Sequence, residues 1–310
     1  MNARKQTTAR CFRVFSIRGA AIHAFMLLLF VVATAAPGWA GAVLTGKGSF
    51  DFPDSLGEPD RPIVIWFYRP AMLKPDAKIV FVMHGANRNG ETYRNQWVEH
   101  AKRENFLLLA PEFPDDLFPS ADYQFGGLRH PDPATWTYWK IERLFDHVKA
   151  SEGLTAARYS IFGHSAGAQF VHRFMLFMPD PRVALAIAAN AGSYTLPIYP
   201  QRGDPKFPWS LDRALVDSRQ LRSVFSQNLL VLLGEEDDDR DHPQLPRSRK
   251  AGMLGENRLK RGVNFYNLAK DHAAARGLPF NWTLATVPGV AHKGASMAKA
   301  AVPYIVNARD

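Results

Sequence analysis

The sequence predicts an α/β fold in which a mostly parallel central sheet carries helices on both faces. Short apolar segments alternate along the chain with longer segments whose apolar residues recur at helical spacing, a pattern typical of parallel sheets. Some of the short segments, such as residues 63–68, are apolar on both faces, as expected of strands buried between two helical layers. The chain has 310 residues, 46% of them hydrophobic, so it can form one large core, and no shift in composition requires a second domain.

The first half of the domain is expected to contain four strands and two helices. We place the strands at residues 43–50, 62–68, 78–83 and 106–110, and the helices at 91–104 and 135–151. The first two strands flank a turn-forming segment, and Pro111 is expected to end the fourth. Residues 111–133 form a long irregular segment, which we expect beside a functional site because long loops in compact domains are often functional.

The second half continues the alternation. We expect strands at residues 159–162, 183–189, 229–233 and 281–287, and helices before Pro179, at 211–226, at 258–276 and at the C-terminus. Residues 194–209 contain four prolines and four aromatic residues, which suggests that they form a wall or a small lid of a binding site. Because parallel strands share one direction, ligands are expected at their carboxyl ends.

The first 40 residues have the layout of a secretory signal peptide: a basic start without acidic residues, an apolar run over 20–36, and a small-residue exit over 37–40. We expect cleavage after Ala40 or Ala42, so that residues 41–310 form the mature domain. This protein would be periplasmic or secreted, without stable membrane association. An uncleaved anchor is the alternative, although the run is short for a membrane span and contains His23.

Much of the positive charge lies in this first segment. The whole chain has a formal net charge of +9, but residues 41–310 contain 33 basic and 29 acidic residues, and they lack the only cysteine, Cys11. The small remaining charge gives no reason to expect a nucleic-acid partner, and a chain without cysteine relies on its core for stability. A basic region within residues 247–261 is expected to be a solvated face: Arg247, Arg249, Lys250, Arg258, Lys260 and Arg261.

Ser165 lies at the apex of a Gly-x-Ser-x-Gly turn, between an apolar strand and a helical segment. In such a nucleophile elbow the backbone is strained, and side chains two positions on either side of the serine would collide with neighbouring chain. Gly163 and Gly167 occupy those two positions. Although the five-residue motif alone also fits an inert turn, the order of strand, turn and helix favours a catalytic serine.

A serine hydroxyl needs a base to remove its proton and an acid to orient that base. On this type of sheet the three groups follow one another as Ser, Asp or Glu, and His, each after a strand. Of the ten histidines only His292 follows the last strand, so we expect it to be the base. The strand at 229–233 leads to Asp237, the expected acid, with Asp239 as the alternative.

No cofactor or metal ion is expected. The spacing of Asp237, Asp239 and Asp241 suggests a calcium loop, but His242 stands at the position that requires glycine and Ser248 at the position that requires glutamate.

The oxyanion of a tetrahedral intermediate needs two hydrogen-bond donors. One is expected to be the amide of Ala166, directly after the nucleophile, and the other the amide of Ala86, in the loop after the third strand. We regard His84, Asn87 and His164 as possible substrate contacts, although bracing of the loop is the more ordinary role for Asn87.

These motifs together resemble the α/β-hydrolase superfamily: His84-Gly85 after one strand, the elbow at residues 163–167, Gly234 to Asp237, and then His292. The resemblance covers essentially the whole chain after residue 60. Within the superfamily the chain is similar to exported polyhydroxybutyrate depolymerases and to feruloyl or acetyl-xylan esterases. This resemblance implies a hydrolase with a small-molecule or polymeric ester as substrate.

The sequence therefore predicts a serine hydrolase that cleaves carboxylic esters through an acyl-enzyme. Two alternatives stay open: a peptidase or amidase that uses the same three residues, and a binding protein that has kept the fold without catalysis. The residues do not determine the oligomeric state.

Overall fold

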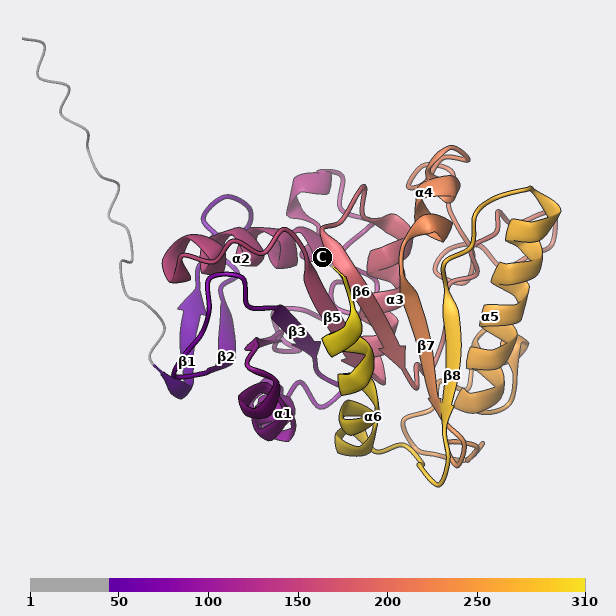
Figure 1. Cartoon of the computed structure of the whole chain (residues 1–310). Coiled ribbons are helices and arrows are strands. Elements are labelled where there is room, and N and C mark those ends of the chain that lie inside the picture. Colours follow the sequence, from indigo (N-terminus) through magenta and orange to yellow (C-terminus); the bar gives the residue numbers. More distant parts are fainter. Residues whose placement is uncertain (1–44, 310) are drawn as a thin grey trace, which may run out of the picture. The chain divides into compact units, whose positions relative to one another are not determined.

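Eight strands form one sheet in the order β1-β2-β4-β3-β5-β6-β7-β8 (Figure 1). The computed structural model describes residues 45–309, so the expected signal peptide and its cleavage positions lie outside the described residues. The antiparallel part of the sheet consists of β1 (Gly46–Phe52), β2 (Ile63–Arg69) and β4 (Leu107–Glu112), with β2 in the middle.

From β4 onward all neighbouring strands are parallel. They are β3 (Ile79–Met83), β5 (Tyr159–His164), β6 (Val183–Ala189), β7 (Leu229–Gly234) and β8 (Thr283–Val287). The predicted mostly parallel sheet is therefore confirmed. Because these strands share one direction, the loops that follow β3, β5, β7 and β8 meet at one edge of the sheet.

Helices cover both faces. On one face lie α1 (Gly90–Glu104) and α6 (Gly294–Asn307), in front of the sheet in Figure 1. The other face packs against α2 (Thr137–Glu152), α3 (Ala166–Phe177), α4 (Gln220–Ser226) and α5 (Arg258–Ala275). Two short 3-10 helices, η1 (Pro133–Thr135) and η2 (Ala251–Leu254), lie in the connections. The adjacent residues Ile161 and Phe162 of β5 belong to the two different core layers, as the alternation of side chains along a strand requires.

Two expected boundaries were wrong. First, β4 continues through Pro111 to Glu112, and Pro111 pairs with Ile65 of β2. Since β3 pairs with β4 only as far as Leu109, the missing amide hydrogen of Pro111 does not interrupt that ladder.

Second, the helix expected at 211–226 begins only at Gln220. Asp212 accepts a hydrogen bond from the amide of Ala214, and Asp217 accepts from the amides of Arg219 and Gln220. These side chains bind backbone donors locally, which favours turns over a continuous helix.

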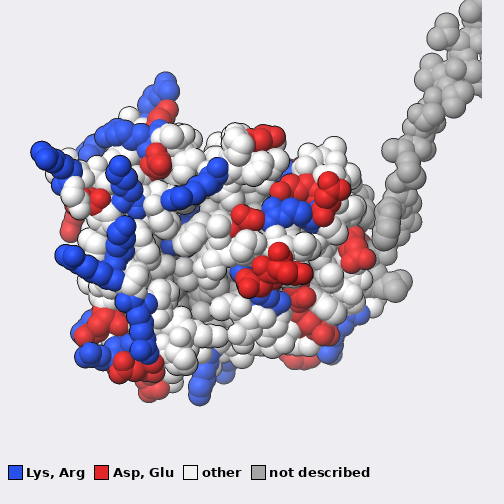
Figure 2. All heavy atoms as spheres, turned by 180° about the vertical axis from the view of Figure 1, so that it is seen from behind, with Lys and Arg blue, Asp and Glu red and all other residues white. Residues whose placement is uncertain are grey.

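The basic region at 247–261 is only partly a solvated face. Arg247, Arg249, Lys250 and Lys260 are exposed, whereas Arg258 and Arg261 are buried, contrary to the expectation. Arg261 donates hydrogen bonds to the carbonyls of Gly192, Pro246 and Gly255, which replace water around its charge. Figure 2 shows Lys and Arg side chains gathered along the left-hand edge of the rear face, with acidic side chains interspersed.

Within residues 45–309, no helix combines the length and the apolar character that a membrane span requires.

Candidate active site

Ser165 joins β5 to α3 in a strained conformation, with φ 58° and ψ −113°. A non-glycine residue rarely adopts a positive φ, so the surroundings must hold this turn. A Cβ atom on Gly163 would lie 2.1 Å from the carbonyl oxygen of Gly167, and one on Gly167 would lie 2.2 Å from that of Met83. The prediction that both positions require glycine is therefore confirmed.

Backbone hydrogen bonds hold the elbow. The amide of Ser165 donates to the carbonyl of Ala189 at the end of β6 (3.0 Å), and its carbonyl accepts from the amide of Gln169 (3.2 Å). The serine is thus fixed between the neighbouring strand and the first turn of α3, above the carboxyl edge of the sheet.

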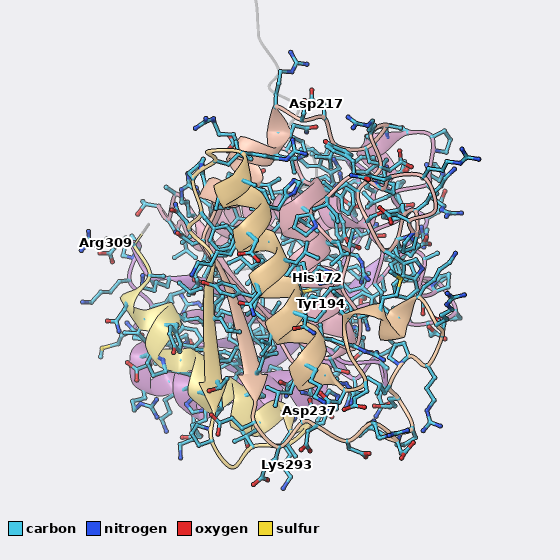
Figure 3. The ribbon with its side chains drawn as sticks, turned by 90° about the vertical axis from the view of Figure 1, so that its right-hand side faces the viewer. His172, Tyr194, Asp217, Asp237, Lys293 and Arg309 are labelled. Atoms are coloured by element: carbon cyan, nitrogen blue, oxygen red, sulfur yellow. The ribbon has the colours of Figure 1, made fainter. Side chains whose placement is uncertain are left out.

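The side chains of Asp237 and His292 meet at the same edge. They follow β7 and β8, and 2.6 Å separates Asp237 Oδ2 from His292 Nδ1. In Figure 3 Asp237 lies close to Lys293, the neighbour of His292, at the lower end of the strands. The two loops are joined by a hydrogen bond from the amide of Glu236 to the carbonyl of Val290.

The same loop places Asp239 differently. Asp237 is 2% exposed, whereas Asp239 is exposed and accepts a hydrogen bond from the amide of Asp241. Of the two carboxylates that the sequence analysis considered, the structure brings Asp237 to His292.

Arg258, which the sequence analysis placed on a solvated face and not at the site, contacts the second oxygen of Asp237. Its Nη1 lies 3.4 Å from Asp237 Oδ1, and its Nη2 lies 3.3 Å from His242 Nδ1. The His242 ring in turn lies edge-on to that of His292, with centroids 5.1 Å apart. Burial lowers the pKa of Arg258, and the carboxylate of Asp237 opposes that shift. One feature of the sequence points to this arginine: at the first position of a helix, a positive charge opposes the helix dipole.

Ser165 and His292 line one pocket with a volume of about 210 Å³. Its wall also contains Ala86 and Asn87 from the loop after β3, and His164 from the elbow. Larger cavities of about 480 and 400 Å³ lie elsewhere and include neither Ser165 nor His292.

The two amides expected to bind the oxyanion, those of Ala86 and Ala166, have no other hydrogen-bond acceptor among the described residues. Ala166 is the first residue of α3, where a helix leaves amide hydrogens without a partner in its own backbone.

The structure places His84 away from the pocket, contrary to the expectation that it contacts substrate. Its ring is fully buried, with Nδ1 donating to the carbonyl of Gly85 and Nε2 accepting from the amide of Phe113, each at 3.0 Å. Burial lowers the pKa of His84 to about 3. Tyr123 donates a hydrogen bond to the carbonyl of His84, so the segment 111–133 supports the loop that follows β3. Contrary to the expectation, no residue of this segment lines the pocket.

Neighbouring residues of this loop brace it. Arg88 donates to the carbonyl of Phe113 and forms an ion pair with Asp115, while Asn87 accepts a hydrogen bond from Gln244. The segment 194–209, expected as a wall or lid, does not line this pocket; its Tyr194 is buried and stacks on Phe265.

His164 lies behind the histidine of the site. Its ring centroid is 4.5 Å from that of His292, and its Nδ1 lies 2.9 Å from the hydroxyl of Tyr93. Burial, together with positive charge on His292 and Arg258, lowers the pKa of His164 well below its ordinary value. The ring is therefore neutral at physiological pH.

A hydroxyl in an elbow, a histidine in the same pocket and a carboxylate bonded to that histidine are the groups that acyl transfer requires. The part of the chain that the structure describes contains no group of three or more His, Cys, Asp or Glu side chains placed to hold a metal ion.

No family model and no curated protein sequence matches the chain. Among solved structures, poly(aspartic acid) hydrolase-1 from Sphingomonas sp. KT-1 is 36% identical, with a TM-score of 0.80 over 85% of this chain and 99% of that one. A poly(3-hydroxybutyrate) depolymerase from Bordetella parapertussis is 33% identical, with a TM-score of 0.79 over 86% and 92%.

More distant structures share the fold. An S-formylglutathione hydrolase from Agrobacterium tumefaciens is 15% identical, with a TM-score of 0.54 over 84% of this chain and 94% of that one. The two closer similarities extend over nearly the full length of those proteins. The chain therefore belongs to the α/β-hydrolase superfamily of hydrolytic enzymes.

Proposed function

We propose that the protein is a serine hydrolase that cleaves carboxylic ester bonds through an acyl-enzyme intermediate. Ser165 is the nucleophile, His292 the general base and acid, and Asp237 the group that orients His292. The amides of Ala86 and Ala166 bind the oxyanion.

In the first half of the reaction, Ser165 Oγ attacks the ester carbonyl carbon while His292 Nε2 takes the hydroxyl proton. The carbonyl oxygen becomes an oxyanion held by the two amides, each of which stabilises the transition state by about 3 kcal/mol. The C–O bond to the alcohol then breaks, and the imidazolium gives its proton to the leaving oxygen. Serine keeps the acyl group.

In the second half, water replaces the alcohol. His292 takes a proton from water, the resulting oxygen attacks the acyl carbon, and the same amides hold the second oxyanion. Collapse breaks the bond to Ser165 Oγ, which recovers its proton from His292. The products are an acid and an alcohol.

The observation that carries this proposal is the 2.6 Å contact between Asp237 Oδ2 and His292 Nδ1, at a pocket that Ser165 shares with His292. A carboxylate that accepts from Nδ1 leaves Nε2 as the basic nitrogen of the neutral ring. The strained φ of Ser165 supports the same assignment, because strain of this kind concentrates at functional turns.

Amide cleavage is a second candidate. The relative of 36% identity is a poly(aspartic acid) hydrolase, and poly(aspartic acid) is a chain of amide bonds. The relative of 33% identity is a depolymerase of a polyester. Both are polymer hydrolases, which supports a polymeric substrate for this chain. We also propose that the protein is exported, on the basis of the sequence of residues 1–40.

The test uses the p-nitrophenyl ester of a short acid, with an acyl amide of p-nitroaniline in parallel. We expect wild-type protein to hydrolyse the ester and to be labelled by a fluorophosphonate probe. Ser165→Ala should lower kcat by at least about 10⁴-fold and abolish labelling. The matched control is Ser160→Ala, which removes a buried hydroxyl from the same strand and should leave both readouts unchanged.

Turnover by folded Ser165→Ala at the wild-type rate would contradict the proposal. A wild-type protein that neither hydrolyses ester or amide nor reacts with the probe would instead indicate a binding protein. Faster cleavage of the amide than of the ester would establish the second candidate.

A further inference from the structure

Three buried polar atoms without a hydrogen-bond partner gather at the pocket that contains Ser165. They are Asn89 Oδ1, Gln96 Oε1 and His164 Nε2, and all three residues line this pocket. Within the described part of the chain, the side-chain amides of Asn89 and Gln96 make no hydrogen bond at all. A buried polar atom without a partner is unfavourable, so such a cluster at a site favours the binding of a polar group there.

The cluster is built on one face of α1. Asn89, Tyr93 and Gln96 follow one another at spacings of four and three residues, which places their side chains on the same side of a helix. Gly294, the first residue of α6, lies opposite: a Cβ atom there would be 3.1 Å from Gln96 Oε1 and 3.3 Å from His164 Nδ1. Glycine at this position therefore keeps space open in front of the polar atoms.

The hydrogen bonds of His164 determine what it offers. The hydroxyl of Tyr93 lies 2.9 Å from His164 Nδ1 and donates its hydrogen to it in the tautomer that carries the His164 hydrogen on Nε2. Burial raises the pKa of Tyr93 to about 12, which keeps this hydrogen in place. Since the ring of His164 is neutral, its remaining hydrogen is on Nε2. His164 is thus a donor, and the two side-chain amides supply acceptors and further donors.

Besides Tyr93, the only described side chains of the pocket wall that can carry a charge are its two histidines, His164 and His292. Among the described residues that line it, none is Asp, Glu, Lys or Arg. A site for a carboxylate or phosphate would be expected to contain a cationic side chain, and a site for a long acyl chain an apolar wall. The arrangement matches a neutral group with its own hydrogen-bond donor.

We propose that Asn89, Gln96 and His164 form a subsite for a neutral hydroxyl- or amide-bearing group of the substrate, next to the scissile carbonyl. This inference rests on the proposed function. It makes Gln96 a specificity-determining residue, and it predicts discrimination between substrates of equal size that differ only in one N–H or O–H group.

The test compares kcat/KM within two matched ester pairs. In the first pair, p-nitrophenyl 3-hydroxybutanoate is compared with p-nitrophenyl 3-methylbutanoate, in which methyl replaces hydroxyl on the acyl side. In the second, 2-acetamidoethyl acetate is compared with 4-oxopentyl acetate, in which methylene replaces N–H on the alcohol side. We expect wild-type protein to prefer the donor-bearing member of at least one pair by about tenfold.

Two variants are expected to remove this preference. Gln96→Met keeps the length of the side chain but loses its polar atoms, and it should reduce the preference to less than about threefold. Gly294→Ala should do the same by filling the space beside Gln96. The matched control is Gln227→Met: Gln227 Oε1 is also buried and unpartnered, but this residue precedes β7, at the opposite edge of the sheet. The control should keep the wild-type preference.

Equal hydrolysis of both members of each pair by wild-type protein would overturn the subsite and leave the proposed function standing. A preference that survives in both Gln96→Met and Gly294→Ala would overturn it as well. If neither member of either pair is hydrolysed, the proposed function fails together with the subsite.

Discussion

At the scale of single residues, the carboxylates of Asp237 and Asp239 show how strongly the fold separates neighbours in sequence. The two lie in one acidic loop, but only Asp237 points inward, where His292 and Arg258 each contact one of its oxygens. A carboxylate that orients a histidine must be held rigidly and away from water, and only one of the two meets this condition.

We therefore predict that Asp237→Asn lowers kcat for a p-nitrophenyl ester by about 10⁴-fold, because the amide favours the wrong tautomer of His292. Asp239→Asn makes the same chemical change in an exposed side chain and should alter kcat by less than about twofold. Steady-state measurement of kcat for both variants tests this prediction. Equal losses of kcat in both variants, or a larger loss in Asp239→Asn, would show that Asp237 is not the acid of the triad.

At the scale of elements, the turn between β5 and α3 depends on close approach of three backbone segments. A Cβ atom on Gly163 would meet the carbonyl of Gly167 across the turn, and one on Gly167 would meet that of Met83 at the end of β3. These neighbours are backbone atoms in the centre of the sheet, so they have little freedom to move away. The glycines are thus needed for packing, and the serine conformation follows from that packing.

Gly163→Ala should therefore destabilise the protein by about 3 kcal/mol, because its methyl group would overlap backbone atoms. Gly252→Ala is the matched control: it lies in η2, and an added Cβ would meet nothing within 4 Å. Urea denaturation followed by tryptophan fluorescence measures both. An unchanged unfolding midpoint for Gly163→Ala would show that the elbow tolerates a side chain.

At the scale of the whole molecule, three buried histidines make stability depend on pH. Burial lowers the pKa of His84 to about 3 and lowers those of His164 and His172 well below the ordinary value of 6.5. Above pH 6.5 neither the folded nor the unfolded state protonates them. As the pH falls below 6.5, the unfolded state binds protons that the folded state does not, so stability is lost in this direction.

Each such histidine contributes a slope of about 1.4 kcal/mol per pH unit, so the three together approach about 4 kcal/mol per unit well below pH 6.5. We expect the free energy of unfolding in urea to fall steeply between pH 6.5 and pH 5. His84→Gln, whose side-chain oxygen replaces Nε2 as acceptor for the amide of Phe113, should reduce the slope by about 1.4 kcal/mol per pH unit. His130→Gln changes an exposed histidine and should leave the slope unaltered. A free energy that stays constant over this range would refute the prediction.

The sequence by itself determined the α/β class, the parallel sheet and the elbow around Ser165. It also indicated which loops would carry the acid and the histidine. These features rest on local properties: the spacing of apolar residues, the steric need for glycine, and the order of strands along the chain. Because parallel strands end at one edge, their order is enough to bring residues 165, 237 and 292 to the same region.

Only the tertiary structure decided which way the loop side chains point. It selected Asp237 over Asp239, turned His84 into the core, buried Arg258 beside the acid, and left Asn89 and Gln96 without partners at the pocket. Each of these outcomes depends on contacts between distant segments, such as that of Asp237 with His292, 55 positions apart, or that of Asn87 with Gln244, 157 positions apart. Periodicity describes a residue's neighbours along the chain, whereas burial and hydrogen bonding of a loop side chain depend on what other elements place against it.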